Sequence, residues 1–200
     1  LFFWDMDKHL IATAINVACT AQEVEGRSNL NADFWHDVRE QLRARLGKDL
    51  LVLGWIGAAG DQSPHLMFRQ AAEERMRKLR GLERTAELAR RIVAAWDEAH
   101  DGARQDMHAD AALVHKVLTV DLPVRKVTTQ ERDQARAKVE VYAKDPNRRG
   151  IMRWHQAAID RYDRQQAGDL APLVVELHVI RLGDVVIATN PFELFTDYGI

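Results

Sequence analysis

Residues 10–56 place an amphipathic helix between two apolar runs, and this order constrains the fold more than any other feature. Residues 10–18 predict a largely buried strand, paired as a hairpin with residues 1–4. An apolar stripe then predicts a helix that ends at Gly47. A second apolar run, residues 50–56, lacks alternation, which is typical of a strand covered on both faces. Strand, helix and strand in this order predict an α/β sheet. The helical stripe consists of Phe34, Val38, Leu42 and Leu46.

Charged helical sequence dominates the middle of the chain, at about residues 70–167. Apolar residues three and four positions apart predict one long helix over about residues 70–100. Two further helices follow, and the first opens where Thr128 and Glu131 have the spacing of a capping box. We interpret this region as a helical insertion that packs beside the sheet.

Strands are predicted on both sides of the last two helices. Residues 114–122 form the first of them, and residues 173–182 and 185–189 form a hairpin around the turn signal Gly183-Asp184. A helix start is predicted at residues 192–195. The fold class that follows is α/β, with a mixed β-sheet core, flanking helices and a long helical insertion.

We predict one such domain over residues 1–200. Because the chain opens in strand-like sequence and closes soon after a helix start, we expect it to be a fragment of a longer protein. Its formal net charge is −2, which leaves no electrostatic footprint for nucleic acid. No apolar run approaches the roughly 20 residues that a transmembrane helix needs. The single cysteine, Cys19, excludes an internal disulfide framework and lies in an apolar run, so we interpret it as a small buried residue.

The turn Gly60-Asp61-Gln62-Ser63-Pro64 is the first candidate for chemistry. It follows a predicted buried strand and a run of small residues, which let a backbone approach a ligand closely. Ser63 is a candidate nucleophile, but a serine hydroxyl needs a base or a metal, and His65 is too close in sequence to be assumed as that base. The alternative is a tight turn in which Asp61 caps backbone amides and Pro64 sets the exit.

Glu193 is the second candidate, because it follows a strand end and is flanked by aromatic residues. A carboxylate in such a position can ligate a metal or act as a general acid or base, and the alternative is a first-turn Glu favoured by the helix dipole. The eight histidines are scattered, and none is spaced as a zinc pair on a helix. His178 lies beside Glu176 on one strand face, which we interpret as a cross-strand structural role rather than ligation.

Four short segments resemble, in the same order, segments of the neutral/alkaline, non-lysosomal ceramidases. Each is moderately specific, and together they cover the two ends of the chain, leaving residues 70–166 unmatched in detail. The turn at Gly60–Pro64 is similar to the Gly-Asp-x-Ser-Pro segment of that family. The other three are Asn16-Val17-Ala18-Cys19, Asn31-Ala32-Asp33-Phe34, and Val185–Thr189 with Asn190-Pro191-Phe192-Glu193-Leu194-Phe195-Thr196.

The resemblance implies a zinc-dependent hydrolase that cleaves the N-acyl bond of ceramide, a reaction of sphingolipid metabolism. By the same resemblance, Ser63 matches the active-site serine, Asp61 holds the turn beside it and Glu193 matches a carboxylate zinc ligand. The zinc site is incomplete in this chain, since an earlier His and a later Tyr of the family would lie outside it. The implied partner is a small-molecule or lipid substrate, and the implied location is secreted or periplasmic.

This sequence also departs from the family pattern. Thr20 stands where the family has a His, His65 stands where Asn is usual, and Phe192 precedes Glu193 in place of Gly. Threonine is a poor zinc ligand, so the departures favour a divergent branch with another substrate, another metal arrangement or no catalysis. Three hypotheses stay open: a ceramidase-like hydrolase with Ser63 and Glu193 in one cleft, a non-catalytic relative that binds lipid or glycan in a larger exported protein, and a purely structural domain.

Overall fold

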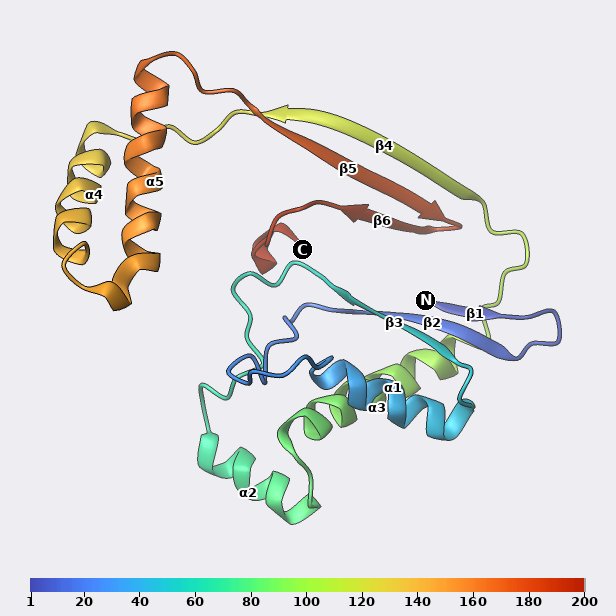
Figure 1. Cartoon of the computed structure of the whole chain (residues 1–200). Coiled ribbons are helices and arrows are strands. Elements are labelled where there is room, and N and C mark those ends of the chain that lie inside the picture. Colours follow the sequence, from blue (N-terminus) through green and yellow to red (C-terminus); the bar gives the residue numbers. More distant parts are fainter. Residues whose placement is uncertain (200) are drawn as a thin grey trace. The chain divides into compact units, whose positions relative to one another are not determined.

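The computed structural model describes residues 1–199, which form two compact units (Figure 1). Unit 1 contains Leu1–Ala109 and the C-terminal segment from Phe192, and unit 2 contains Asp110–Pro191. Sheets and flanking helices are both present, which confirms the predicted α/β class. The predicted insertion at about residues 70–167 coincides with neither unit, because the helices up to Ala103 belong to unit 1.

Unit 1 is built on a three-stranded sheet with the order β1-β2-β3. β1 (Phe2–Trp4) and β2 (Leu10–Val17) form the predicted antiparallel hairpin. β3 (Leu51–Ile56) pairs with β2 in parallel. A parallel pair needs a crossover connection, and α1 (Phe34–Leu46) supplies it, so the sheet is mixed as predicted.

Two helices, α1 and α3 (Arg84–Ala103), cover one face of this sheet (Figure 1). The predicted stripe of α1 faces the core through its first three members, whereas Leu46 is 39% exposed. Trp96 of α3 is buried, and its indole N–H donates to the hydroxyl of Thr13 over 2.9 Å. This bond satisfies both polar groups inside the core. The core cluster consists of Val38, Leu42, Leu50, Val52, Ala89, Val93 and Trp96.

Within the described residues of unit 1, no element covers the opposite face of the sheet, so unit 1 alone does not give the predicted strand covered on both faces. Val52 points into the core, but its neighbours Leu51 and Leu53 are 65% and 52% exposed. An unbroken apolar run indicates that both faces of a strand are apolar, but it does not indicate whether another element covers the second face.

The predicted long helix over about residues 70–100 is two helices. α2 (Gln70–Arg80) ends at Gly81, which adopts the left-handed conformation with φ of 65°, and α3 begins three residues later. Glycine reaches this conformation without steric cost and ends helices for that reason. The apolar periodicity continues on both sides of Gly81, so periodicity alone hid the break.

Unit 2 contains a second sheet with the order β4-β5-β6, all antiparallel. β4 (Leu113–Leu122) pairs with β5 (Leu173–Leu182) along its whole length. β5 and β6 (Val185–Thr189) form the predicted hairpin, with Gly183 in the left-handed conformation at its turn. The three predicted strands are therefore confirmed.

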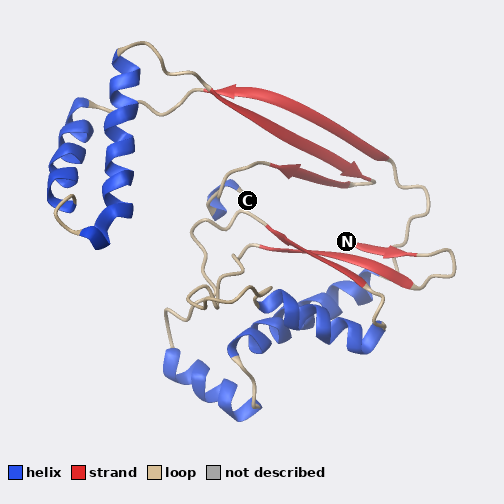
Figure 2. Cartoon of the chain, viewed as in Figure 1, coloured by secondary structure: helices blue, strands red, loops and turns tan. Residues whose placement is uncertain are grey.

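A helix pair, α4 (Thr129–Tyr142) and α5 (Arg149–Gln166), lies in sequence between β4 and β5 (Figure 2). A 3-10 turn, Pro146–Arg148, joins the two helices. The predicted capping box is confirmed, because Thr128 and Glu131 each accept the other's backbone N–H. Across residues 1–199, no helix combines the length and the apolar character that crossing a bilayer requires.

Candidate functional site

The candidate site of unit 1 lies beyond the carboxyl ends of the two parallel strands. Val17 and Ile56 pair at the last position of the ladder, and the N–H of Gly57 donates to the Val17 carbonyl over 3.1 Å. Two loops follow, residues 18–33 after β2 and residues 57–69 after β3. Ligand sites of open α/β sheets gather at such strand ends. The turn at Gly60–Pro64 thus lies at the edge of the sheet from which the loops after β2 and β3 begin side by side.

The Gly60–Pro64 turn meets the C-terminal segment around Glu193. The N–H of Gly60 donates to the carbonyl of Leu194 over 2.8 Å. The two carboxylate oxygens of Asp61 accept hydrogen bonds from Thr196, one from its N–H and one from its hydroxyl, each over 2.8 Å. Asp61 and Thr196 are 135 residues apart in sequence. The structure therefore brings together two segments that the sequence singled out separately.

Gly60 permits this contact because it has no side chain. A Cβ at this position would lie 2.7 Å from the carbonyl oxygen of Glu193 and 2.8 Å from a ring carbon of Phe195. The Cγ of Glu193 would be 3.2 Å away. The carbonyl belongs to the backbone and cannot rotate aside, so any larger residue must push the two segments apart.

Asp61 holds the Gly60–Pro64 turn against the segment that contains Thr196. The N–H of Thr196, followed by its hydroxyl, holds the pKa of Asp61 below its ordinary value, because both bonds favour the ionised form. With both oxygens engaged, the carboxylate is ionised at neutral pH and has no proton to give. We assign it a positioning role, as the resemblance implies.

Ser63 is exposed at the outer end of the turn. Its Oγ accepts the N–H of His65 over 3.2 Å, which is a local turn contact. The imidazole of His65 is directed to Glu25, with 3.9 Å between Nε2 and Oε1. Among residues 1–199, no side chain hydrogen-bonds to the Ser63 hydroxyl, so no base is in place to activate it in this structure.

Glu193 is exposed and lies beside Gly60. The predicted helix start at residues 192–195 was wrong, because the only helical turn there is a 3-10 turn over Thr196–Tyr198. Glu193 therefore does not lie in the first turn of a helix, and no helix dipole stabilises its charge. The alternative interpretation of Glu193 as a first-turn Glu was wrong. In the described part of the chain, its carboxylate has no hydrogen bond or ion pair. Both of its oxygens are available to a ligand.

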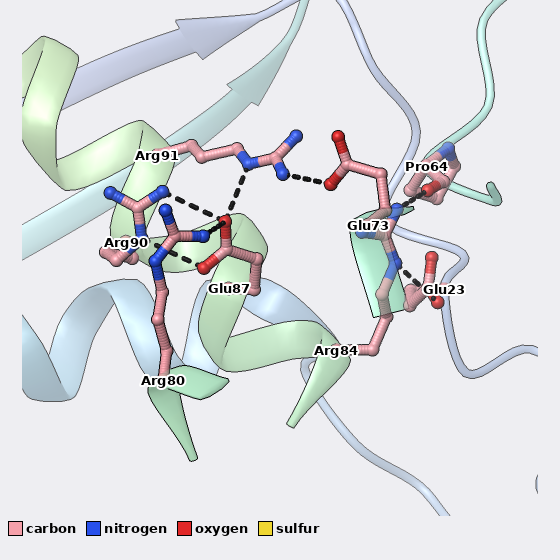
Figure 3. A network of polar contacts seen from close by, with 8 residues as sticks. All are labelled: Glu23, Pro64, Glu73, Arg80, Arg84, Glu87, Arg90 and Arg91. Carbon is pink, nitrogen blue, oxygen red and sulfur yellow. Dashed lines mark hydrogen bonds and ion pairs between the residues drawn. The ribbon is translucent and has the colours of Figure 1, made fainter. Parts of the chain in front are cut away.

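An ion pair fixes the exit of the turn (Figure 3). Arg84, the first residue of α3, donates to the Pro64 carbonyl through Nη2 and to Oε1 of Glu23 through Nε over 3.1 Å. The side chains of Arg84 and Glu23 are 18% and 12% exposed, so solvent screens this pair less than a surface pair. The loop after β2, the turn after β3 and α3 are thereby joined. No sequence pattern predicts this contact, because it links positions 61 and 20 residues apart without a motif.

The loop after β2 also carries buried polar atoms without partners. Within residues 1–199, the hydroxyl of Thr20 and the second carboxylate oxygen of Glu23 are such atoms. A buried polar group without a partner costs about 1–3 kcal/mol. Such groups are uncommon, and each calls for a water or a ligand that would satisfy it. Thr20 is the residue at the position where the family resemblance expects a His.

Cys19 precedes Thr20 and is half-buried. Burial raises the pKa of its thiol, and the nearby carboxylates of Asp33 and Glu23 raise it further. The thiol is therefore protonated at neutral pH and a poor nucleophile. Asp33 itself ties the loop to α1, because it accepts the N–H groups of Phe34 and Val24 over 2.8 Å and 2.9 Å.

Zinc, which the resemblance implies, can be tested against the donor atoms of the described residues. One group of three side chains lies close enough to share an ion, Asp5, Asp7 and His9 in the β1–β2 turn. Asp5 already accepts the backbone N–H groups of Asp7 and His9, so its carboxylate organises the turn. Glu193 belongs to no such group. The described residues thus offer one carboxylate to a zinc ion at the candidate site and not a complete ligand set.

Comparison with known proteins returned nothing: no family model, no curated protein and no solved structure matches this chain.

Proposed function

We propose that unit 1 carries the site of a ceramidase-like hydrolase that cleaves an N-acyl bond in a lipid or related substrate. The observation that carries the proposal is the meeting of the Gly60–Pro64 turn with the segment Glu193–Thr196 through Asp61 and Gly60. Both segments resemble parts of one family's active site. Two short chance resemblances have no reason to become neighbours across 135 residues, so their contact supports the proposal.

The reaction adds water across the amide C–N bond and yields a carboxylic acid and an amine. Of the residues present, the free carboxylate of Glu193 suits a general acid or base, since it has no competing partner among the described residues. The exposed hydroxyl of Ser63 suits a donor to the acyl oxygen or, with a base supplied, a nucleophile. Asp61 and Gly60 hold these two segments together.

Bound zinc would supply Lewis-acid polarisation of the acyl oxygen and of water. Because the described residues provide Glu193 alone at this site, we derive no step through the metal. The alternative function is that of a non-catalytic relative, a lipid- or glycan-binding module of a larger exported protein. Two observations favour it, the missing base at Ser63 and the threonine at position 20.

The test is hydrolysis of a fluorescent N-acylsphingosine by the purified chain, with and without added zinc. Ser63→Ala and Glu193→Gln should each lower the rate by at least tenfold. Matched controls are Ser28→Ala and Glu140→Gln, because both residues are exposed and lie outside the two segments. Equal rates in all four variants would reject the site. Binding of the lipid without turnover, unchanged in the Ser63 variant, would select the non-catalytic alternative.

A further inference from the structure

Two histidines of unit 2 meet across neighbouring strands, on a face that the candidate site does not use. In the β4–β5 ladder, His115 pairs with Ile180 and Val117 pairs with His178, so the histidines are diagonal neighbours. Partners in a ladder point to the same face, and diagonal neighbours are within reach of long side chains. His115 Nε2 and His178 Nδ1 are 2.9 Å apart.

A carboxylate fixes the proton on the second of these rings. His178 Nε2 lies 3.0 Å from Oε1 of Glu176, two residues earlier on the same strand. A carboxylate accepts hydrogen bonds, so Nε2 carries the proton and Nδ1 presents its lone pair to His115. A carboxylate on the outer nitrogen of a metal-binding histidine is the usual arrangement at metal sites, because it sets the tautomer and raises the basicity of the ligand nitrogen.

The charges on this face favour a cation. Its strand residues include two acids, Glu176 and Asp121, and among the described strand positions neither a lysine nor an arginine. The strands' two basic residues, Lys116 and Arg181, alternate to the opposite face. Thr189 on β6 adds an oxygen beside His178, whose N–H it accepts over 3.3 Å. A cation entering between the histidines meets no opposing charge from the strands.

We infer that His115 and His178 form a binding site for a divalent transition cation such as Zn²⁺, with Glu176 as the outer partner of His178. Two nitrogens that bind one tetrahedral zinc at 2.0–2.1 Å stand about 3.4 Å apart, so the pair needs to open by only about half an ångström. His115 must then hold its proton on Nδ1, a tautomer shift that leaves both facing nitrogens unprotonated. Imidazole selects Zn²⁺, Ni²⁺ and Cu²⁺ over Mg²⁺ and Ca²⁺, which prefer oxygen.

The site is open, and this limits its affinity. Glu176 bonds to the far nitrogen of His178, and no group of three donors forms here among the described residues. Water must complete the coordination, as in sites that keep positions free. The inference is independent of the proposed hydrolase, because none of its residues lies in unit 1.

The experiment is calorimetric titration of the full chain with Zn²⁺ and, separately, with Ca²⁺. We expect a zinc site that His115→Asn or His178→Asn abolishes, and that Glu176→Gln weakens about 10–100-fold through the outer partner alone. Ca²⁺ should give no heat at this site. The matched control is His108→Asn, since His108 also lies 3.0 Å from a carboxylate but has no second histidine.

Two further variants separate this site from the other metal-ligating groups. His9→Asn removes one donor of the Asp5-Asp7-His9 group, and Glu193→Gln removes the carboxylate of the candidate site. Zinc binding that survives both and is lost with His115 or His178 supports the inference. Binding that survives both histidine variants, or that disappears with His9→Asn instead, would overturn it. Circular dichroism of each variant shows whether a loss reflects the ligand or the fold.

Discussion

Unit 1 and unit 2 differ in how deeply their contacts bury side chains. The core of unit 1 joins α1, β3 and α3, through residues such as Val38, Val52 and Val93. In unit 2, the helices pair with their nearest neighbour in sequence, and strand residues such as Leu113 and Val174 stay 71% and 63% exposed. Buried non-local packing therefore fixes the strand ends that carry the candidate site. Unit 2 rests on the β4–β5 ladder, which is also non-local but leaves many strand side chains exposed, and on the local pairs α4–α5 and β5–β6.

Removing a tryptophan from each unit should give the largest difference. Trp96→Ala in unit 1 takes away a side chain that is 4% exposed and removes the indole N–H that donates to the Thr13 hydroxyl, which keeps only its own bond to the Leu1 carbonyl. We expect the free energy of unfolding to fall by about 3–5 kcal/mol. Trp154→Ala in unit 2 removes a side chain that is 72% exposed, and it should change stability by less than about 0.5 kcal/mol. Urea denaturation followed by circular dichroism measures both, and equal losses would contradict the comparison.

Glu87 in α3 should give the next largest effect, through pH. Its carboxylate is buried and forms ion pairs with Arg80, Arg90 and Arg91 (Figure 3). Hydrogen bonds from Arg90, opposed by burial and aided by Arg91, lower its pKa to about 2. Because the folded pKa lies below the ordinary value of 4.5, the ionised form stabilises the fold above about pH 5. This stability is lost as the pH falls towards 2, by roughly 2–3 kcal/mol after allowing for the partly exposed arginines.

The matching variant is Glu87→Gln. It should lower the free energy of unfolding at pH 7, and that free energy should then fall less than in the parent chain between pH 5 and pH 2. Glu98→Gln changes an exposed glutamate of the same helix and serves as the control. In unit 2, hydrogen bonds from Thr128, followed by Arg125, lower the pKa of Glu131 to about 2 as well, but the Glu131 side chain is 36% exposed, against 2% for Glu87. An acid-induced loss that is the same in Glu87→Gln and in the parent chain would show that the buried network is not its source.

Elements of the fold that depend on neighbouring residues were predictable from the sequence. The capping box at Thr128, the turn at Gly183 and the stop of α1 at Gly47 each express a local hydrogen bond or a local backbone preference, and all three are present. The break at Gly81 was missed because the apolar spacing runs through it. The exposure of Leu51 and Leu53 within unit 1 was missed because coverage of a strand depends on distant segments.

The candidate site shows the same division between features set by neighbouring residues and features set by distant segments. Sequence pattern singled out Asp61 and Glu193, but pattern alone could not place them together, because a contact across 135 residues leaves no periodic trace. Only the family resemblance implied that the two segments share a site. The histidine pair is a second case. Glu176 beside His178 was visible as a strand alternation, and we expected a cross-strand structural role there rather than the metal ligation that we infer from the pair. The partner His115 depends on the register of β4 against β5.

Gly60→Ala tests the non-local contact of unit 1 directly. The added methyl group would stand 2.7 Å from the Glu193 carbonyl oxygen, so we expect a loss of about 1–3 kcal/mol. The matched control is Gly102→Ala near the end of α3, where a Cβ meets nothing within 4 Å and alanine should stabilise the helix by about 0.5–1 kcal/mol. Amide hydrogen exchange at Thr196 reports the contact itself, and unchanged protection in Gly60→Ala would contradict the close approach.

Thr128→Ala should give the smallest effect, because it removes one local hydrogen bond of unit 2. The Thr128 hydroxyl accepts the N–H of Glu131 over 3.2 Å, and loss of such a cap costs about 1 kcal/mol. Thr128→Ser keeps the hydroxyl and should retain most of that stability. Hydrogen exchange in the first turn of α4 should rise in the alanine variant, while the turn around Asp61 keeps its protection. A loss at Asp61 as well would mean that the local cap of unit 2 stabilises the site of unit 1, and the contrast between local and non-local stabilisation would then fail.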